Sequence, residues 1–175
     1  FYNCKNIENI TLPQTLWKID DMALWGCEKI KKLELTSKIS SVGSYVFRDC
    51  KALEEIIVVP ENTYFKSVDG ILYEKKKYMR MMVCPAMKQG IVTVADGMHE
   101  IGTEAFHDCK YVTEVRLPES LETINSSAFE GCSALEKIEL PDNIEQIGMY
   151  AFEDCTALKS VKLPARLTDI DQAVF

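Results

Sequence analysis

The sequence has little of what would point to a membrane or to a nucleic acid. No apolar run exceeds four residues, as in Ile56 to Val59 or Met81 to Cys84, whereas a membrane-spanning helix needs about 20. Basic residues are outnumbered 20 to 27, and the net charge of -7 argues against a surface that binds nucleic acid. Glycine and proline number only 8 and 6, too few for a linker or a collagen-like chain. The first residues lack the basic start and the apolar stretch of a secretory signal.

Residues suited to catalysis are also scarce. The chain has only two histidines, His99 and His107, and both fall at positions that we expect to face solvent. A glycine-rich phosphate loop, an H-E-x-x-H motif and a G-x-S-x-G motif are all missing. Acidic residues are common, but they fall at outward positions of the repeat described below, which favours a solvated surface over an acid–base pair. We therefore expect no catalytic residue, no metal site and no cofactor.

What the sequence does contain is a repeat. Apolar residues make up 47% of the chain, which is enough for a buried core. Six of the seven cysteines follow one another in steps of 23, except for one step of 59, which equals 2 × 23 + 13. Such self-similarity indicates a solenoid with one insertion of 13 residues. The six cysteines are Cys4, Cys27, Cys50, Cys109, Cys132 and Cys155.

Each repeat carries the motif L-x-x-I-x-L-P-x-x-L-x-x-I-G-x-x-A-F-x-x-C. The alternating I-x-L segment predicts a half-buried strand, and one strand per repeat stacked in register makes a parallel sheet. The proline after it ends the strand, because proline cannot donate to the ladder. Sixteen places after the cysteine comes glycine, asparagine or aspartate, which predicts a left-handed residue in a turn. These residues are Asp20, Gly43, Gly102, Asn125, Gly148 and Asp171.

The motif resembles the BspA-like leucine-rich repeats of bacterial surface proteins, also called the Treponema pallidum type, over nearly the whole chain. The resemblance implies a β-rich leucine-rich repeat solenoid, a right-handed coil with a parallel strand stack and about 23 residues per repeat. We expect about seven coils around one continuous hydrophobic core. Members of that family are secreted or lie on the cell surface, and they are associated with adhesion to host proteins or to other cells.

The insertion spans about residues 61–87, and its segment from Asn62 to Tyr73 resembles one that recurs in the same family. We predict a β-hairpin with strands at 70–73 and 78–84, a turn through the lysines at 75–77, and an end at Pro85. The whole chain, 1–175, then forms a single array. Because no polar caps are visible at its ends, we expect it to be a fragment of a longer protein.

Three states are open to the cysteines of the repeat. Stacked neighbours would lie near a separation that a disulfide can bridge, and a column of thiols could bind a metal. Small apolar cysteines at a repeat corner are more often plain packing, so reduced, buried thiols are the favoured interpretation. Cys84 lies outside the column, on the predicted hairpin, and is expected to be the most exposed thiol.

Two groups of side chains are not explained by the repeat motif. Tyr2, Trp25 and Arg48 share the position two residues before the cysteine, and Trp17 occupies an otherwise polar position. Exposed aromatics beside an arginine are typical of interface anchors, although contact with preceding sequence is an equal alternative. The second group is the hairpin, whose aromatics could dock a partner but are better explained as a cover of the solenoid, because half of them must face inward.

We therefore predict a non-enzymatic module that binds a protein of the host or of a cell surface, with no nucleic acid and no membrane insertion in this segment. Two alternatives stay open: a structural spacer, and an accessory region of a larger surface enzyme. The resemblance implies an extracellular or cell-surface location. The candidate contact residues are Tyr2, Trp17, Trp25, Arg48, Tyr64, Phe65, Tyr73 and Tyr78.

Overall fold

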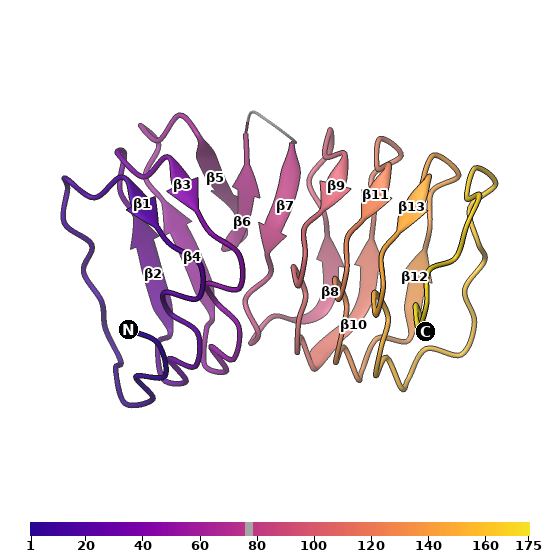
Figure 1. Cartoon of the computed structure of the whole chain (residues 1–175), viewed down its shortest axis with the longest axis horizontal. Coiled ribbons are helices and arrows are strands. Elements are labelled where there is room, and N and C mark those ends of the chain that lie inside the picture. Colours follow the sequence, from indigo (N-terminus) through magenta and orange to yellow (C-terminus); the bar gives the residue numbers. More distant parts are fainter. Residues whose placement is uncertain (76–78) are drawn as a thin grey trace.

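The computed structural model describes residues 1–75 and 79–175, and these residues form strands and turns but no helix. It follows that the described chain contains no helix able to cross a membrane. The coils stack along the long axis of the molecule, from the N-terminal coil at one end to the C-terminal coil at the other (Figure 1). The predicted solenoid of 23-residue repeats is thus confirmed.

Two kinds of strand recur along the stack. The longer strands come from the I-x-L segments and pair in parallel, for example Lys32 with Glu55 and Glu114 with Lys137, each 23 residues apart. Short strands on the next side of each coil pair in the same way. The longer strands are β2 (Lys32–Leu35), β4 (Glu55–Val58), β8 (Gln89–Thr93), β10 (Tyr111–Arg116) and β12 (Lys137–Glu139). The short strands are β1 (Lys18–Ile19), β3 (Ser41–Val42), β9 (Glu100–Ile101), β11 (Thr123–Ile124) and β13 (Gln146–Ile147).

The insertion forms three strands, one more than the predicted hairpin. They are β5 (Phe65–Val68), β6 (Ile71–Glu74) and β7 (Arg80–Val83), and each pairs antiparallel with the next. Asp69 and Gly70 join β5 to β6 with positive φ angles of 51° and 73°, as tight hairpin turns require. Because β7 also pairs in parallel with β9, the insertion is built into a six-stranded sheet of order β13-β11-β9-β7-β6-β5.

The core is divided at the insertion, which corrects the expectation of one continuous core. Its N-terminal cluster runs from Ile19 to Leu72 and its C-terminal cluster from Ile71 to Val174. Strand β6 is shared, because alternate side chains of a strand point to opposite faces. Leu72 packs into the N-terminal cluster, while Ile71 and Tyr73 pack into the C-terminal one. In Figure 1, β6 and β7 accordingly lie between the two halves of the solenoid.

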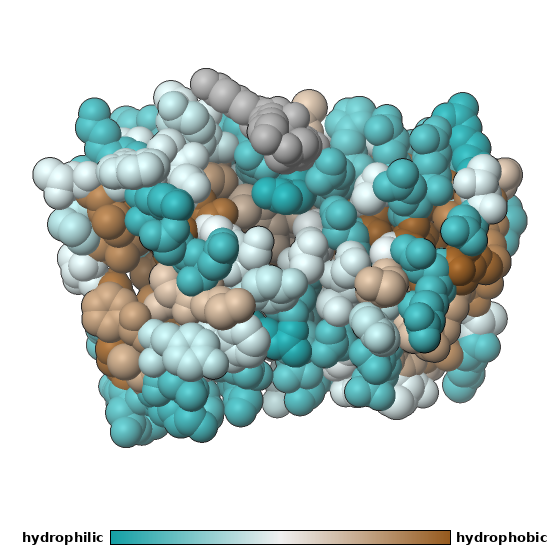
Figure 2. All heavy atoms as spheres, in the orientation of Figure 1, coloured by the Kyte–Doolittle hydropathy of each residue, from teal (hydrophilic) through white to brown (hydrophobic). Residues whose placement is uncertain are grey.

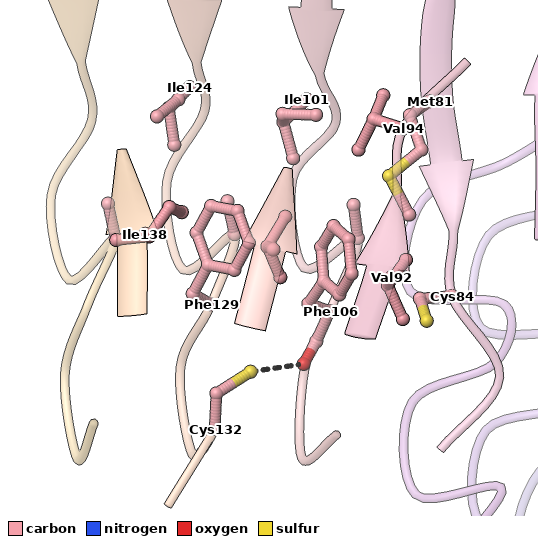
Figure 3. Packing of buried hydrophobic residues seen from close by; sticks show 14 of the residues in the cluster. Met81, Cys84, Val92, Val94, Ile101, Phe106, Ile124, Phe129, Cys132 and Ile138 are labelled. Carbon is pink, nitrogen blue, oxygen red and sulfur yellow. Dashed lines mark hydrogen bonds between the residues drawn. The ribbon is translucent and has the colours of Figure 1, made fainter. Parts of the chain in front are cut away.

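A stack of phenylalanine rings runs through the C-terminal half. The ring of Phe129 lies 4.8 Å from that of Phe106 and 5.1 Å from that of Phe152, and Phe175 follows at 5.3 Å. The amide of Phe106 donates to the carbonyl of Ala128 in the next coil at 2.7 Å. The recurring Ala-Phe pair of the motif therefore joins each coil to the next by a backbone hydrogen bond and by ring stacking. Figure 3 shows the neighbouring rings of Phe106 and Phe129.

Cys84 takes the next place in this ring column. Its amide donates to the carbonyl of Ala105 at 2.6 Å, which is the bond that Phe106 makes one coil later. The prediction that Cys84 is the most exposed thiol is therefore wrong: the residue is only 4% exposed, because it closes the coil in place of a phenylalanine (Figure 3).

The predicted left-handed turn falls elsewhere in the repeat. Among the glycines, asparagines and aspartates sixteen places after the cysteine, none has a positive φ. Glycine is required at two of these positions because the coils touch there: a Cβ on Gly43 would lie 2.5 Å from the Asp21 amide nitrogen, and one on Gly148 would lie 2.6 Å from that of Ser126. The left-handed residues come two places later, at Met22, Tyr45, Glu104, Ser127, Tyr150 and Ala173, and directly before the cysteine.

Candidate functional site

The two halves of the solenoid meet at a seam that contains a cavity. Its volume is about 160 Å³. Cys84, which takes the place of a ring in the phenylalanine column, is part of its lining. Apolar side chains of the N-terminal half and of the insertion surround it, together with a group of charged ones. The lining includes Phe47, Leu53, Cys84, Gly102, Glu104 and His107.

Arg48 bridges this seam. Its guanidinium forms an ion pair with the carboxylate of Glu104 and a hydrogen bond of 3.4 Å to Glu130 Oε1, 82 residues further along the chain. The Glu104 side chain is only 7% exposed and that of Arg48 24%. Opposite charges so far from water interact more strongly than a surface pair. Arg48 therefore links the N-terminal half to the C-terminal half.

The sequence led us to expect His107 in solvent, but the residue lies beside this ion pair. Its side chain is 10% exposed, with Nδ1 at 3.7 Å from Glu130 Oε1. Burial lowers the pKa of His107 below 6.5, and the positive charge of Arg48 lowers it further, although Glu130 and Asp108 oppose the shift. The ring is consequently neutral near pH 7. The other histidine, His99, is exposed as expected, with its side chain 42% accessible.

An aromatic ladder, formed by Tyr2, Trp25, Tyr45 and Arg48, adjoins the seam. The Trp25 ring lies 5.8 Å from the Tyr2 ring and 6.2 Å from the Tyr45 ring, and the Arg48 guanidinium carbon lies 5.3 Å from the Trp25 centroid. Trp25 Nε1 donates to Asp49 Oδ2 at 3.1 Å, which fixes the indole. The structure thus brings together the three residues that the sequence placed in one column.

Tyr45 belongs to the ladder but was not predicted. It lies five residues before its cysteine, at a left-handed turn position that holds a second tyrosine, Tyr150, and otherwise dissimilar residues. The sequence signal for it is weak, because only the fold shows that this position lies against the column two residues before the cysteine. Trp17 is outside the ladder: it precedes β1, and its side chain stands 61% exposed.

The hairpin aromatics separate into buried and exposed ones. Phe65 is 3% exposed and Tyr73 is 0% exposed, so neither side chain is available to a partner in the folded chain. The Tyr73 hydroxyl accepts a hydrogen bond from the Ala95 amide, and burial raises the pKa of Tyr73 to about 12. Tyr64 is 43% exposed. Tyr78 lies outside the described residues.

All seven cysteines are free thiols in the structure. In the repeat column the thiols of Cys27, Cys50, Cys109, Cys132 and Cys155 each donate to a carbonyl of the preceding coil. The bond from Cys132 to Phe106 is 3.1 Å long (Figure 3). Burial raises the pKa of Cys50 and of Cys155 to about 12. These contacts support the packing interpretation, since a buried thiol of high pKa is a poor nucleophile and a poor metal ligand.

Comparison with known families matches the chain to the BspA type leucine-rich repeat region, in six copies over residues 1–69 and 83–175. The chain belongs to the BspA-type leucine-rich repeat family. The six copies are one fewer than the seven coils expected. The unmatched residues of this BspA-type protein, 70–82, include β6 and most of β7, which belong to the part that departs from the repeat.

Solved structures of bacterial leucine-rich repeat proteins share this fold. A cell-surface protein from Faecalibacterium prausnitzii A2-165 is 25% identical with a TM-score of 0.78, over 96% of this chain and 50% of that one. The pneumococcal vaccine antigen PcpA is 25% identical with a TM-score of 0.76, over 83% of this chain and 42% of that one. A repeat protein from Eubacterium ventriosum is 21% identical with a TM-score of 0.80, over 88% and 41%. The present BspA-type chain thus spans at most half the length of these proteins. No curated protein matches it.

Proposed function

We propose that this chain is a non-enzymatic, protein-binding repeat module of a secreted or cell-surface bacterial protein, and that the aromatic ladder anchors its partner. The observation that carries the proposal is the row of partly exposed rings on the N-terminal half, with Tyr2 57% and Tyr45 38% exposed. Aromatic and arginine side chains dominate the binding energy of protein interfaces. The partner class is a host protein or a protein of another cell surface, as in adhesion.

The ladder is ordered before any partner binds. Asp49 holds the Trp25 indole by a hydrogen bond, and Arg48, which stacks on the same ring, is itself paired with Glu104. Side chains that are already fixed lose little conformational entropy on binding. A partner can therefore gain contact area with the rings at a low entropic cost.

The column of Tyr2 and Trp25 has no aromatic side chain in the C-terminal half. In the repeats of the C-terminal half, the position of Tyr2 and Trp25 is taken by His107, Glu130 and Glu153. In the view of Figure 2 the middle of the molecule is mostly hydrophilic, and hydrophobic side chains gather toward the two ends. A partner that recognises aromatic rings beside an arginine would find this combination in the ladder of the N-terminal half.

The test is the binding of the chain to intact host cells and to a panel of secreted host proteins, measured by biolayer interferometry. Trp25→Ala should weaken binding at least about tenfold, which corresponds to a loss of about 1.4 kcal/mol, and Tyr2→Ala and Trp17→Ala should act in the same direction. Circular dichroism has to show that each variant is folded. Tyr111→Ala is the matched control, because Tyr111 is a 54% exposed aromatic on β10 of the other half.

An equal loss for Tyr111→Ala, or no loss for Trp25→Ala, would place the contact elsewhere. A chain that binds no cell and no protein of the panel would instead behave as a spacer, and the proposed function would then be wrong.

A further inference from the structure

The polar cluster at the seam contains two buried atoms that lack a hydrogen-bond partner among the described residues: Nδ1 of His107 and Oε2 of Glu104. Their side chains are only 10% and 7% exposed. An unsatisfied buried polar atom is costly and uncommon in a native protein, so it calls for an explanation such as a bound ion. In the tautomer that carries its proton on Nε2, both atoms are acceptors, and a cation or another donor would satisfy both.

The geometry of the cluster suits a single ion. One ligand atom each of Glu104, His107 and Glu130 lies within 4.8 Å of the others. Ligands of one zinc ion, at about 2.0–2.2 Å from the metal, lie about 3–4 Å from one another. Closing from separations of up to 4.8 Å to this spacing takes side-chain adjustments of about 1–2 Å.

Stacking of two coils holds these three residues in place. Glu104 and His107 belong to one turn, and Glu130 occupies the position of His107 one coil later. Backbone hydrogen bonds join the two coils on both sides of His107, from the Phe106 amide to the Ala128 carbonyl at 2.7 Å and from the Asp108 amide to the Glu130 carbonyl at 2.9 Å.

The charges around the cluster favour a cation. Asp49 and Asp108 also lie within ligand distance of His107. Four carboxylates thus surround the imidazole, whereas the cations that pair with them are the Arg48 guanidinium and the Lys110 ammonium.

We propose that Glu104, His107 and Glu130 form a binding site for a divalent transition-metal ion, with zinc as the fitting example. Carboxylate and imidazole ligands suit zinc. Arg48 holds the two carboxylates in the metal-free chain, and the ion displaces its guanidinium from them. The adjoining cavity of about 160 Å³, which Glu104 and His107 line, gives the ion an entry path and leaves room for a water as a further ligand.

The site is tested by calorimetric titration of the whole chain with zinc chloride, together with NMR of the histidine side chains. We expect a Kd of about 10 µM or below, with the His107 Nδ1 resonance shifting on binding. His107→Ala and Glu104→Gln should each weaken binding at least about tenfold. Arg48→Met should tighten it, because a competing cation is removed. His99→Ala is the matched control, since His99 is the only other histidine and is exposed beside Glu122.

Cobalt loading separates this site from the thiols. Cobalt bound by carboxylates and imidazole shows weak visible bands, whereas cobalt bound by cysteine adds intense near-ultraviolet charge-transfer bands. Those intense bands, a shift confined to His99, or zinc affinity unchanged in Glu104→Gln would each overturn the proposal. So would the absence of both heat and a His107 shift at about 1 mM zinc. Because the NMR measurement uses the unmodified chain, the test stands even if His107→Ala fails to fold.

Discussion

The N-terminal half of the solenoid (1–59) and the C-terminal half (88–175) use the same repeat in different ways. In the C-terminal half the inward column before the cysteine is phenylalanine in every repeat, and the rings stack. In the N-terminal half that column reads Phe1, Leu24 and Phe47, while the rings gather on the outside as the aromatic ladder. Inward positions are constrained by the neighbouring coil, whereas outward positions are free to acquire a binding role.

The insertion separates these two halves and lets them differ. Strand β6 is covered on both faces, with Ile71, Leu72 and Tyr73 all at most 2% exposed, so that each half packs against the same strand. At the seam the ring column is interrupted by Cys84, and the gap is bridged by charged side chains. The comparison thus shows a stack of phenylalanine rings on one side of the seam and, on the other, an apolar core without such a stack.

The largest expected effect concerns the ring stack. Phe129→Ala should destabilise the chain by about 3–5 kcal/mol, because it removes a fully buried ring and leaves a cavity. Phe175→Ala, at the 58% exposed end of the stack, is the matched control and should cost less than about 1 kcal/mol. Urea unfolding followed by circular dichroism measures both. Similar losses for the two variants would show that the rings do not act as a buried stack.

The next effect concerns the start of the insertion, where Asn62 occupies a column that is leucine, isoleucine or methionine in the other repeats. Its Nδ2 donates to the carbonyls of Thr36 and Ile39, and its Oδ1 accepts from the amides of Tyr64 and Phe65, all at 2.8–2.9 Å. Asn62→Leu should therefore cost about 2–4 kcal/mol in chemical unfolding, since four buried backbone groups lose their partner.

Asn125→Ala is the control for this substitution, because Asn125 makes a single side-chain bond, to the Ile101 carbonyl, and should cost about 1 kcal/mol. A stabilised Asn62→Leu variant would mean that the repeat accepts the consensus residue there and that the bonds of Asn62 contribute nothing.

A smaller effect tests the link between the halves. Arg48→Met should destabilise the chain by about 1–2 kcal/mol, because the buried carboxylate of Glu104 is left without its cation, although Arg48 is partly solvated. The double variant Arg48→Met/Glu104→Gln should recover part of that loss. A double-mutant cycle from urea unfolding measures the coupling energy. Strictly additive losses would show that the ion pair does not join the halves.

The smallest effect is a dependence on pH, measured in a metal-free buffer. Because the folded-state pKa of His107 is lowered below 6.5 by burial and by Arg48, the unfolded chain binds more protons at acidic pH. This contribution to stability is present above about pH 6.5 and is lost as the pH falls below it. His107→Gln should therefore flatten the stability profile between pH 7.5 and 5.5, while His99→Gln should follow the unmodified chain.

Much of the fold follows from the sequence because period and hydrophobicity act locally. The column of cysteines, the I-x-L strands and the Ala-Phe pairs each predict their own place in a coil, and stacking identical coils leaves one arrangement that buries them all. The ladder residues Tyr2, Trp25 and Arg48 were found in the same way, because residues of one column lie side by side in a solenoid. Strand β5 was not predicted. Its first residue occupies the position of a short strand of the repeat, and only the residues after it depart from the repeat.

The repeat pattern thus specifies the solenoid, its period and the side chains that face its interior, because each coil carries the same local pattern. The contacts at the insertion are set by the three-dimensional packing: Cys84 takes the place of a ring, His107 is buried, and Arg48 reaches Glu104 and Glu130. The physical reason is that these contacts join residues on opposite sides of the insertion, which does not follow the 23-residue repeat. Their separation depends on how the three inserted strands pack between the two halves, and the repeat motif does not specify that packing.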